Sequence, residues 1–370
     1  MPQLDNDLTL HRLAELVSAE TPSAHAEGLL RCYRLLREWG DPLFGRPAEI
    51  VTVRGTPHLF WRPVREPAVL LLGHADTVWP LGTLADRPFR AADGRATGPG
   101  VFDMKAGLVL ALDALALAAD TAHVGMLVTG DEEIGSPTSR ALIEKAAAEA
   151  AAVLVLEPSL GGAVKTARKG GAFYSVDITG RASHAGLEPE SGINALLELA
   201  HQTLAVHRLG DPAKGTTVTP TVATAGTVTN AVPAAASLRV DVRAWEKAEL
   251  DRVHRRLGEL TPVVPGASIT LSGEINRMPL EQQSSRDLLA LARRIAERQG
   301  LGDVAEAAAG GASDGNFTAA LGIPTLDGLG PDGDGAHARH EWADLASLGR
   351  RARLVAGLLD ALADPLPPAA

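Results

Sequence analysis

The chain has 370 residues, 45% of them hydrophobic and 22% charged, which is enough apolar sequence to bury one large core or two ordinary ones. Its 35 basic and 45 acidic side chains leave a formal charge of −10, which disfavours nucleic acid and anionic membranes as main partners. The single cysteine, Cys32, excludes an intrachain disulfide and a cysteine-rich zinc module. Because Cys32 lies in an apolar-periodic stretch, we expect a buried helical thiol there.

The N-terminal sequence is acidic and amphipathic, without the basic region and apolar core of a signal peptide. No apolar run approaches the roughly 20 residues needed to cross a bilayer. These features predict a cytoplasmic protein that does not enter a membrane.

Short apolar runs alternate with helical patterns in residues 1–169. Three of the runs have the length and composition of strands buried on both faces: Ala68–Leu72, Val124–Thr129 and Ala152–Leu156. The helical patterns cover Met104–Ala119 and Thr138–Ala150. This alternation predicts an α/β domain with a mostly parallel central sheet.

Residues 170–280 have a different texture. Apolar and polar side chains alternate around Val176 and again around Val240, as in antiparallel strands with one solvated face. Helices are expected at Ile193–His207 and Glu246–Leu260. The order strand, helix, strand, strand, helix, strand is that of a ferredoxin-like α+β domain.

The α/β texture returns in residues 281–370. Helices are expected there at Arg286–Gln299 and Ala346–Leu362. The sequence therefore predicts a small α+β domain inserted into a larger α/β domain.

Three predicted strands of the larger domain each run into a potential metal ligand. His74 follows the first strand and Glu157 the third, while the pair Glu132–Glu133 follows the second. Ligands bind outside the carboxyl ends of strands in open α/β sheets, so we expect these side chains to converge on one crevice.

Asp103 joins this set from the segment GPGVFDMK, immediately before a long apolar helix. Alone it is typical of a helix N-cap, a role worth about 1 kcal/mol, but beside the three strand ends we interpret it as a ligand. Imidazole with several carboxylates and no thiolate suits zinc, with Mn²⁺ or Co²⁺ as substitutes. In His74-x-Asp76, the aspartate is expected to fix the tautomer of the imidazole.

The adjacent carboxylates of Glu132 and Glu133 repel each other, so burying both is costly without a cation. At the mouth of a sheet, such a pair indicates that one side chain binds metal and the other handles protons. Zinc lowers the pKa of a bound water to about 7 to 9, and a neighbouring carboxylate can accept its proton.

The sequence resembles the M20 metallopeptidases, and within them the glutamate carboxypeptidases of the carboxypeptidase G2 type. Aminoacylases, succinyl-diaminopimelate desuccinylase and acetylornithine deacetylase are more distant members. The resemblance covers nearly the whole chain and rests on the motifs GHADTV, GPGVFDMKAG, GDEEIGS, LEPS, GRASHAG, GTVTNAVPAAASLRVDVR and GAH. It implies a zinc-peptidase-like catalytic domain from residues 1–169 and 281–370, with residues 170–280 as a lid and dimerisation domain.

The resemblance also implies two zinc ions bridged by Asp103. His74 and Glu157 would complete one site, and Glu133 and His337 the other.

Further roles follow from the same resemblance. Glu132 would be the general base, Asp76 would orient His74, and the peptide bond after Asp103 would be cis. The last metal ligand is either His337 or His340. The family's spacing to a glutamate four residues on, here Glu341, favours His337.

The inserted domain gains a role only through the resemblance. By itself, His184 in GRASHAG is more typical of a surface histidine. The resemblance implies that it reaches the partner's active site in a homodimer and stabilises the oxyanion, a contribution of about 3 to 4 kcal/mol. The residues implied to contact the substrate are Asn230, Arg243, Arg277 and the backbone N–H groups of Gly310 and Gly311, although either arginine could be a solvated charge.

The leading hypothesis is a di-zinc carboxypeptidase that releases a C-terminal amino acid, such as glutamate, from a small peptide or N-acyl amino acid. The alternative is an N-acyl-amino-acid deacylase with the same machinery. Within the family, Glu rather than Asp at position 157 disfavours an aminopeptidase. An inactive relative that binds small acids is a minor alternative, because neither Glu132 nor any ligand is missing.

Overall fold

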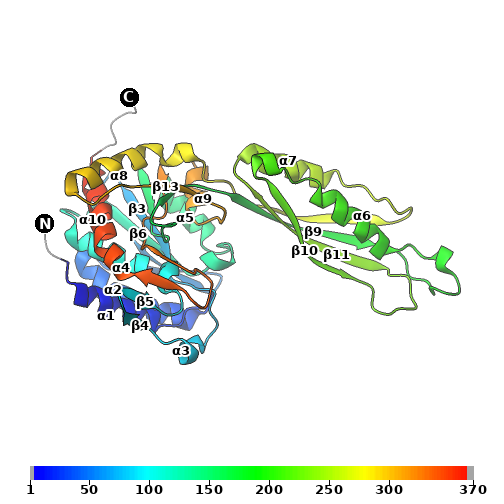
Figure 1. Cartoon of the computed structure of the whole chain (residues 1–370), viewed down its shortest axis with the longest axis horizontal. Helices are drawn as coiled ribbons and strands as arrows, with labels where there is room; N and C mark the ends of the chain where they lie inside the picture. The colour runs from blue at the N-terminus through cyan, green and yellow to red at the C-terminus, as the bar shows by residue number, and fades with distance from the viewer. Residues whose placement is uncertain (1–3, 365–370) are drawn as a thin grey trace. The chain divides into compact units, whose positions relative to one another are not determined.

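The computed structural model describes residues 4–364 (Figure 1). The chain forms two compact units: Met1–Ala167, Glu281–Ala309 and Ser313–Ala370 make the first, and Arg168–Leu280 with Gly310–Ala312 makes the second. The sequence placed the inserted segment at 170–280 and did not indicate that Gly310–Ala312 accompanies it. Arg168 Nη1 donates to the Gly311 carbonyl at 3.1 Å, which helps to hold this short segment in the second unit.

The first unit is built on a six-stranded sheet. Its strand order is β1 (Glu49–Val53), β2 (Thr56–Trp61), β6 (Val124–Thr129), β3 (Val69–His74), β7 (Ala152–Val155) and β14 (Thr325–Leu326). β3 pairs in parallel with β6 and β7, and β14 pairs in parallel with β7, whereas β1 and β2 form an antiparallel edge. This confirms the predicted α/β class with a mostly parallel central sheet.

Alternate side chains of β3 enter different cores. Val69 and Leu71 belong to one core, and Leu70 and Leu72 to the other, as expected for a strand buried on both faces. Helices α1 (Asn6–Val17), α2 (Ala26–Phe44), α4 (Ala106–Leu117), α8 (Arg286–Gln299) and α10 (Leu345–Ala361) contribute to the first core, and α5 (Arg140–Ala148) and α9 (Gly315–Ala320) to the second. Figure 1 shows these helices flanking the sheet.

Cys32 of α2 is fully buried, and burial raises the pKa of its thiol to about 11. This confirms the expected buried thiol. Among residues 4–364, no helix combines the length and apolar character required to cross a membrane.

Smaller elements complete the first unit. Four short strands form an antiparallel sheet in the order β15 (Gly333–Asp334), β16 (Trp342–Asp344), β5 (Arg95–Thr97) and β4 (Arg90–Ala92). The other short elements are α3 (Thr83–Asp86) and the paired strands β8 (Val164–Arg168) and β13 (Glu306–Ala309). The four-stranded sheet joins the segment before Asp103 to the segment around His337, and the sequence did not predict it.

The second unit has the predicted ferredoxin-like order of elements. These are β9 (Gly170–Thr179), α6 (Ala195–His207), β10 (Thr217–Ala225), β11 (Ala235–Ala244), α7 (Lys247–Gly258) and β12 (Ser268–Arg277). The sheet is antiparallel in the order β10-β11-β9-β12. Val176 and Leu238 pack with Leu199 of α6 and Leu250 of α7, so both helices cover the same face of the sheet.

Glu249, in the first turn of α7, is a buried carboxylate with three side-chain partners. It accepts hydrogen bonds from Arg252 and Lys214 at 2.8 Å and from Thr216 at 2.9 Å. The bond from Arg252 is the largest of the effects that lower the pKa of Glu249 to about 2. Because the folded state favours the charged form, this stabilisation is complete above the ordinary pKa of 4.5 and is lost as the pH falls through about 2.

Glu249→Gln is expected to lower the free energy of unfolding at neutral pH by about 1 kcal/mol, because the amide keeps the shape but loses the charge, and solvent partly screens the ion pairs. The difference from wild type should shrink as the pH falls from 4.5 towards about 2. Denaturant unfolding at a series of pH values measures this. Glu259→Gln, which removes an exposed partner of Arg256, is the control with little expected effect. A difference for Glu249→Gln that stays constant over this pH range would contradict the assignment.

Candidate metal centre

Three neighbouring strands deliver polar side chains to one edge of the central sheet. β3 lies between β6 and β7 and is parallel to both, so their carboxyl ends meet. His74 is the last residue of β3, and Glu157 follows the end of β7. The turn Glu132–Ile134 follows β6. The structure therefore brings these side chains to the same edge of the sheet, as the sequence predicts.

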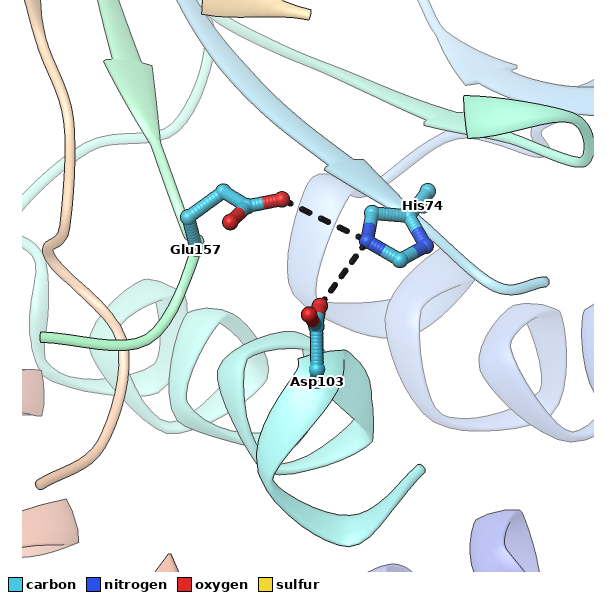
Figure 2. A group of neighbouring side chains, drawn as sticks. All are labelled: His74, Asp103 and Glu157. Atoms are coloured by element: carbon cyan, nitrogen blue, oxygen red, sulfur yellow. Dashed lines mark hydrogen bonds and ion pairs between the residues drawn. The ribbon is translucent and has the colours of Figure 1, made fainter. Parts of the chain in front are cut away.

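One group of ligand atoms surrounds His74 (Figure 2). His74 Nε2 lies 3.1 Å from Asp103 Oδ1 and 3.4 Å from Glu157 Oε1. All three ligand atoms lie within 4.8 Å of one another, which suits a single metal ion.

A second group contains the other oxygen of Asp103. His337 Nε2 lies 3.4 Å from Asp103 Oδ2 and 2.9 Å from Glu133 Oε2. Asp103 is thus the residue that the two groups share. His340 belongs to neither group within residues 4–364.

Asp103 does not act as the cap of α4. That helix begins at Ala106, and the cap position is Lys105, whose side chain makes no capping hydrogen bond. Asp103 lies in the preceding turn with φ −113° and ψ 97°, and its peptide bond to Met104 is cis, as expected. The helix starts two residues later than Met104, the predicted first residue, because the backbone is not helical at Asp103 and Met104.

The charges of the two groups fit bound cations. Burial raises the pKa of Glu133 to about 7, and hydrogen bonds to Asp103 and Glu133 raise the pKa of His337 to about 10. Both shifts reflect the negative charge gathered at this site, which bound cations would offset. Glu133 Oε1 is also buried without a hydrogen-bond partner among residues 4–364. Nitrogen and carboxylate donors in this arrangement fit zinc, with Mn²⁺ or Co²⁺ as alternatives.

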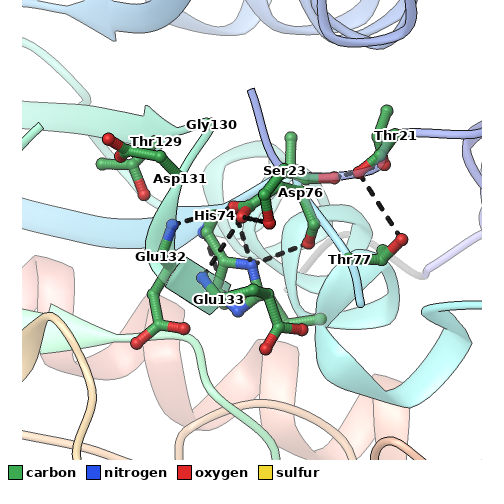
Figure 3. A network of polar contacts seen from close by, with 12 residues as sticks. Thr21, Ser23, His74, Asp76, Thr77, Thr129, Gly130, Asp131, Glu132 and Glu133 are labelled. Carbon is green, nitrogen blue, oxygen red and sulfur yellow. Dashed lines mark hydrogen bonds and ion pairs between the residues drawn. The ribbon is translucent and has the colours of Figure 1, made fainter. Parts of the chain in front are cut away.

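Asp76 contacts both His74 and the turn that carries the paired glutamates (Figure 3). His74 Nδ1 lies 2.9 Å from the Asp76 carbonyl oxygen and 3.4 Å from its carboxylate, so the carbonyl is the nearer partner. The carboxylate accepts hydrogen bonds from the backbone N–H groups of Glu132 (3.1 Å) and Glu133 (3.2 Å), and from Ser23 Oγ (2.7 Å). The link to the glutamate turn was not predicted from the sequence.

Two further buried carboxylates hold the same turn. Asp131 accepts hydrogen bonds from Thr138 Oγ1 (2.6 Å) and Ser139 Oγ (2.5 Å). Asp314 accepts hydrogen bonds from Thr129 Oγ1 (3.0 Å) and from Ser136 Oγ. Ser136 is 178 residues away from Asp314 in the chain, so no local sequence pattern indicates this contact.

The two predicted substrate-binding arginines lie in one row of the second unit. Arg243 of β11 and Arg277 of β12 both pair with Gly171 of β9, which places them on the same face of the sheet. A Cβ atom at Gly171 would lie 2.9 Å from Arg243 Nη1, so glycine leaves room for that guanidinium. Arg243 also forms an ion pair with Asp241, with Nη2 to Oδ2 at 2.9 Å. Gly310 and Gly311 are exposed in the same unit.

His184 and Asn230 are neighbours in the second unit. The Asn230 carbonyl accepts a hydrogen bond from the N–H of Ala185 at 2.9 Å, and both side chains are exposed. His184 Nδ1 accepts hydrogen bonds from the N–H groups of Gly186 and Leu187, each at 3.1 Å. His184 follows the end of β9 at Thr179, whereas the arginine row lies near its start, roughly 26 Å away along the strand. The structure therefore separates the predicted substrate-contacting residues into two sets.

Comparisons with known proteins show the family and the fold of the chain. The model of peptidase family M20/M25/M40 matches residues 70–361. The chain is 34% identical to carboxypeptidase G2 of Pseudomonas sp. (strain RS-16) over 79% of this chain and 73% of that one. It is 32% identical to the succinyl-diaminopimelate desuccinylase of Maricaulis maris over 54% of this chain and 55% of that one. The crystal structure of an aminopeptidase from Bacillus cereus superposes with a TM-score of 0.76 at 20% identity, over 98% of this chain and 100% of that one, which shows a shared fold.

Two ligand groups that share Asp103 at the edge of a parallel sheet are typical of a metal-dependent hydrolase. With a family match over most of its length, the chain belongs to the M20/M25/M40 peptidases.

His337→Ala is expected to lower the zinc content by about one ion per chain, because His337 belongs to only one of the two ligand groups. His340→Ala, three residues away and outside both groups, is the matched control and should keep the wild-type content. Elemental analysis after dialysis against metal-free buffer measures both variants. Zinc loss in His340→Ala with retention in His337→Ala would reverse the assignment.

Proposed function

We propose that the chain is a two-zinc carboxypeptidase that hydrolyses an amide bond and releases a C-terminal amino acid from a small peptide or N-acyl amino acid. The observation that carries the proposal is the position of Asp103, whose two oxygens lie in two different ligand groups. A carboxylate in this position can serve two ions at once, as two-metal hydrolases require. All the ligands and Glu132 are present, which disfavours an inactive relative.

Bound zinc would polarise the scissile carbonyl and lower the pKa of a water molecule to about 7 to 9. Glu132 is the proposed base: it is largely buried, and the bond from its N–H to Asp76 fixes the start of its side chain. Figure 3 shows the side chains of Glu132 and Glu133 extending from the same turn beside His74. Glu133 would hold metal with one oxygen, while Glu132 takes a proton from water and returns it to the leaving nitrogen.

The acyl group of the substrate distinguishes the two candidate activities. Carboxypeptidase G2 shares a higher identity over a longer alignment than the desuccinylase, and this favours a carboxypeptidase. The desuccinylase similarity supports an N-acyl-amino-acid deacylase as the second candidate. Both activities cleave an amide bond beside a carboxylate.

The row of Arg243 and Arg277 is proposed to bind the substrate carboxylate. Guanidinium groups can donate two parallel hydrogen bonds to a carboxylate. Gly171 between them leaves space on that face of the sheet. The backbone of Gly310 and Gly311 would supply further contacts. Asn230 lies beside His184 and would contact the substrate together with it.

The chain is also proposed to form a homodimer through the second unit. Helix α6 exposes Leu196, Leu197 and Leu204, with exposed fractions of 48%, 51% and 58%. The adjacent β10 is an edge strand that exposes Val222. Apolar side chains beside an unpaired strand edge favour association. His184 would then act in the partner's site.

The cytoplasmic location stays a prediction from the sequence.

The substrate class can be tested by product release. The wild-type enzyme is expected to release glutamate from p-aminobenzoyl-glutamate faster than it deacylates N-succinyl or N-acetyl amino acids. Glu132→Gln should lower turnover by about 10²- to 10⁴-fold while keeping zinc, because it loses only the proton acceptor. Chelation of the metal should abolish turnover. Faster hydrolysis of the N-succinyl substrate would favour the deacylase, and full activity of metal-free enzyme would refute the metal proposal.

Mixed dimers test the role of His184. His184→Ala and Glu132→Gln are each expected to be nearly inactive alone. If His184 serves the partner's site, one site of each mixed dimer has both residues, so an equal mixture should recover about a quarter of wild-type activity after subunit exchange. Recovery is measured after co-refolding, with each variant alone as control. If His184 acts within its own chain, no activity returns.

A further inference from the structure

Glu341 is a buried carboxylate beside the metal centre that belongs to neither ligand group in residues 4–364. Only 1% of its surface is exposed. It lies four residues after His337 and directly before β16. Burial of another acid so close to Asp103 is unfavourable unless its charge has its own partners.

Those partners are N–H groups, and three of them come from one loop. Glu341 Oε1 accepts hydrogen bonds from the backbone N–H groups of Phe102 (3.0 Å) and Asp103 (3.2 Å). Oε2 accepts hydrogen bonds from the backbone N–H of Gly100 and from Trp79 Nε1, both at 3.0 Å. The carboxylate thus binds the backbone of the very residue that both ligand groups share.

The loop is also packed tightly on the side of Thr77. Gly100 has φ +71°, and a Cβ atom there would lie 2.3 Å from Thr77 Cγ2. In the segment that carries His337, a Cβ atom at Gly335 would lie 3.0 Å from the Cα of Glu341. A Cβ atom at Gly333, in the segment that carries His337, would lie 2.7 Å from Phe102 Cδ2 of the loop that carries Asp103. The loop and the segment therefore approach each other closely, and the hydrogen bonds of Glu341 join them.

We propose that Glu341 is a positioning residue for the metal centre. Its carboxylate accepts hydrogen bonds from three N–H groups of the Gly100–Asp103 loop and thereby fixes the position of the Asp103 carboxylate. Because Glu341 is also four residues from His337, the same contact sets the distance between Asp103 and His337, which ligate together in the second group. This inference rests on the proposed two-metal function. It states that Glu341 strengthens ion binding by the second group, Asp103, Glu133 and His337.

The test is zinc binding by the metal-free full-length chain, measured in competition with a chromophoric chelator. Glu341→Gln is expected to weaken binding of at least one Zn²⁺ by about 10- to 100-fold, as for other residues that orient ligands. The visible absorption of the Co²⁺-loaded variant should also change, because the ligand geometry around the ion changes. A variant that binds both ions with wild-type affinity and gives the wild-type Co²⁺ spectrum would overturn the proposal.

Two control variants separate positioning from general stability. Asp113→Asn removes another buried carboxylate of the first unit, which binds Thr9 (2.6 Å) and Arg12 (3.4 Å) and belongs to neither ligand group among residues 4–364. It should keep wild-type zinc affinity even if it lowers the unfolding temperature as much as Glu341→Gln does. Trp79→Phe removes one donor of Glu341 but leaves the three loop contacts, and it should also keep wild-type affinity. Equal zinc loss in either control would overturn the positioning role.

Two remaining outcomes are also informative. If Glu341→Gln does not fold, Glu341→Asp keeps the charge but shortens the side chain by one methylene, and it should fold and still bind zinc more weakly. Wild-type affinity in Glu341→Asp would then overturn the proposal. If the wild-type chain itself binds no zinc, the proposed two-metal function fails. This result differs from one in which wild type and Glu341→Gln bind zinc equally well, which refutes only the positioning role of Glu341.

Discussion

Negative charge gathered at one edge of the central sheet is the constraint on which the first unit depends. Asp103 has a ligand atom within 4.8 Å of Glu157 in one group and of Glu133 in the other, and Glu132 extends from the same turn as Glu133. Carboxylates can be buried together only when cations or hydrogen-bond donors offset their charge. The protein supplies the two kinds of compensation to different acids. The ligands face histidines and the proposed ions, whereas the acids that do not ligate bind N–H and O–H groups of the surrounding loops.

The acids that do not ligate give the centre its geometry. Asp76 holds the turn of Glu132 and Glu133 through two backbone N–H groups, and Glu341 holds the loop of Asp103 through three. Each bond joins a charged acceptor to a backbone donor, which makes it stronger than a neutral hydrogen bond. Since Asp103, Glu133, Glu157 and His337 sit in turns and loops beyond the strands, these bonds supply rigidity that long regular elements would otherwise provide.

Strong local patterns made part of this arrangement predictable. β6 and α8 have the expected limits, Val124–Thr129 and Arg286–Gln299, because their apolar periodicity begins and ends sharply. The sequence also placed His74, Glu133 and Glu157 after strands, since a strand followed by an acid or histidine is visible without the fold. The family resemblance supplied the pairing of ligands into two groups, which spacing alone does not give.

Contacts between distant segments were not predictable in the same way. Glu341 and Asp103 are 238 residues apart, and the spacing of Glu341 from His337 indicated a motif but not its partner. The strands β15 and β16 have two and three residues, too few for a repeating pattern. Asp131 is a loop acid next to two glutamates, so its bonds to Thr138 and Ser139 are visible only once the turn is folded.

The division of the chain explains why the metal motifs do not identify a substrate. All five proposed ligands and Glu132 belong to the first unit, while the arginine row, His184 and Asn230 belong to the second. The chemistry at the metal centre is the same for any amide bond beside a carboxylate. The residues that perform it therefore carry no information about the acyl group. Similarity to both a carboxypeptidase and a desuccinylase is then the expected result. Differences in specificity should arise from side chains of the second unit, where changes can alter substrate contacts without adding charge to the crowded sheet edge.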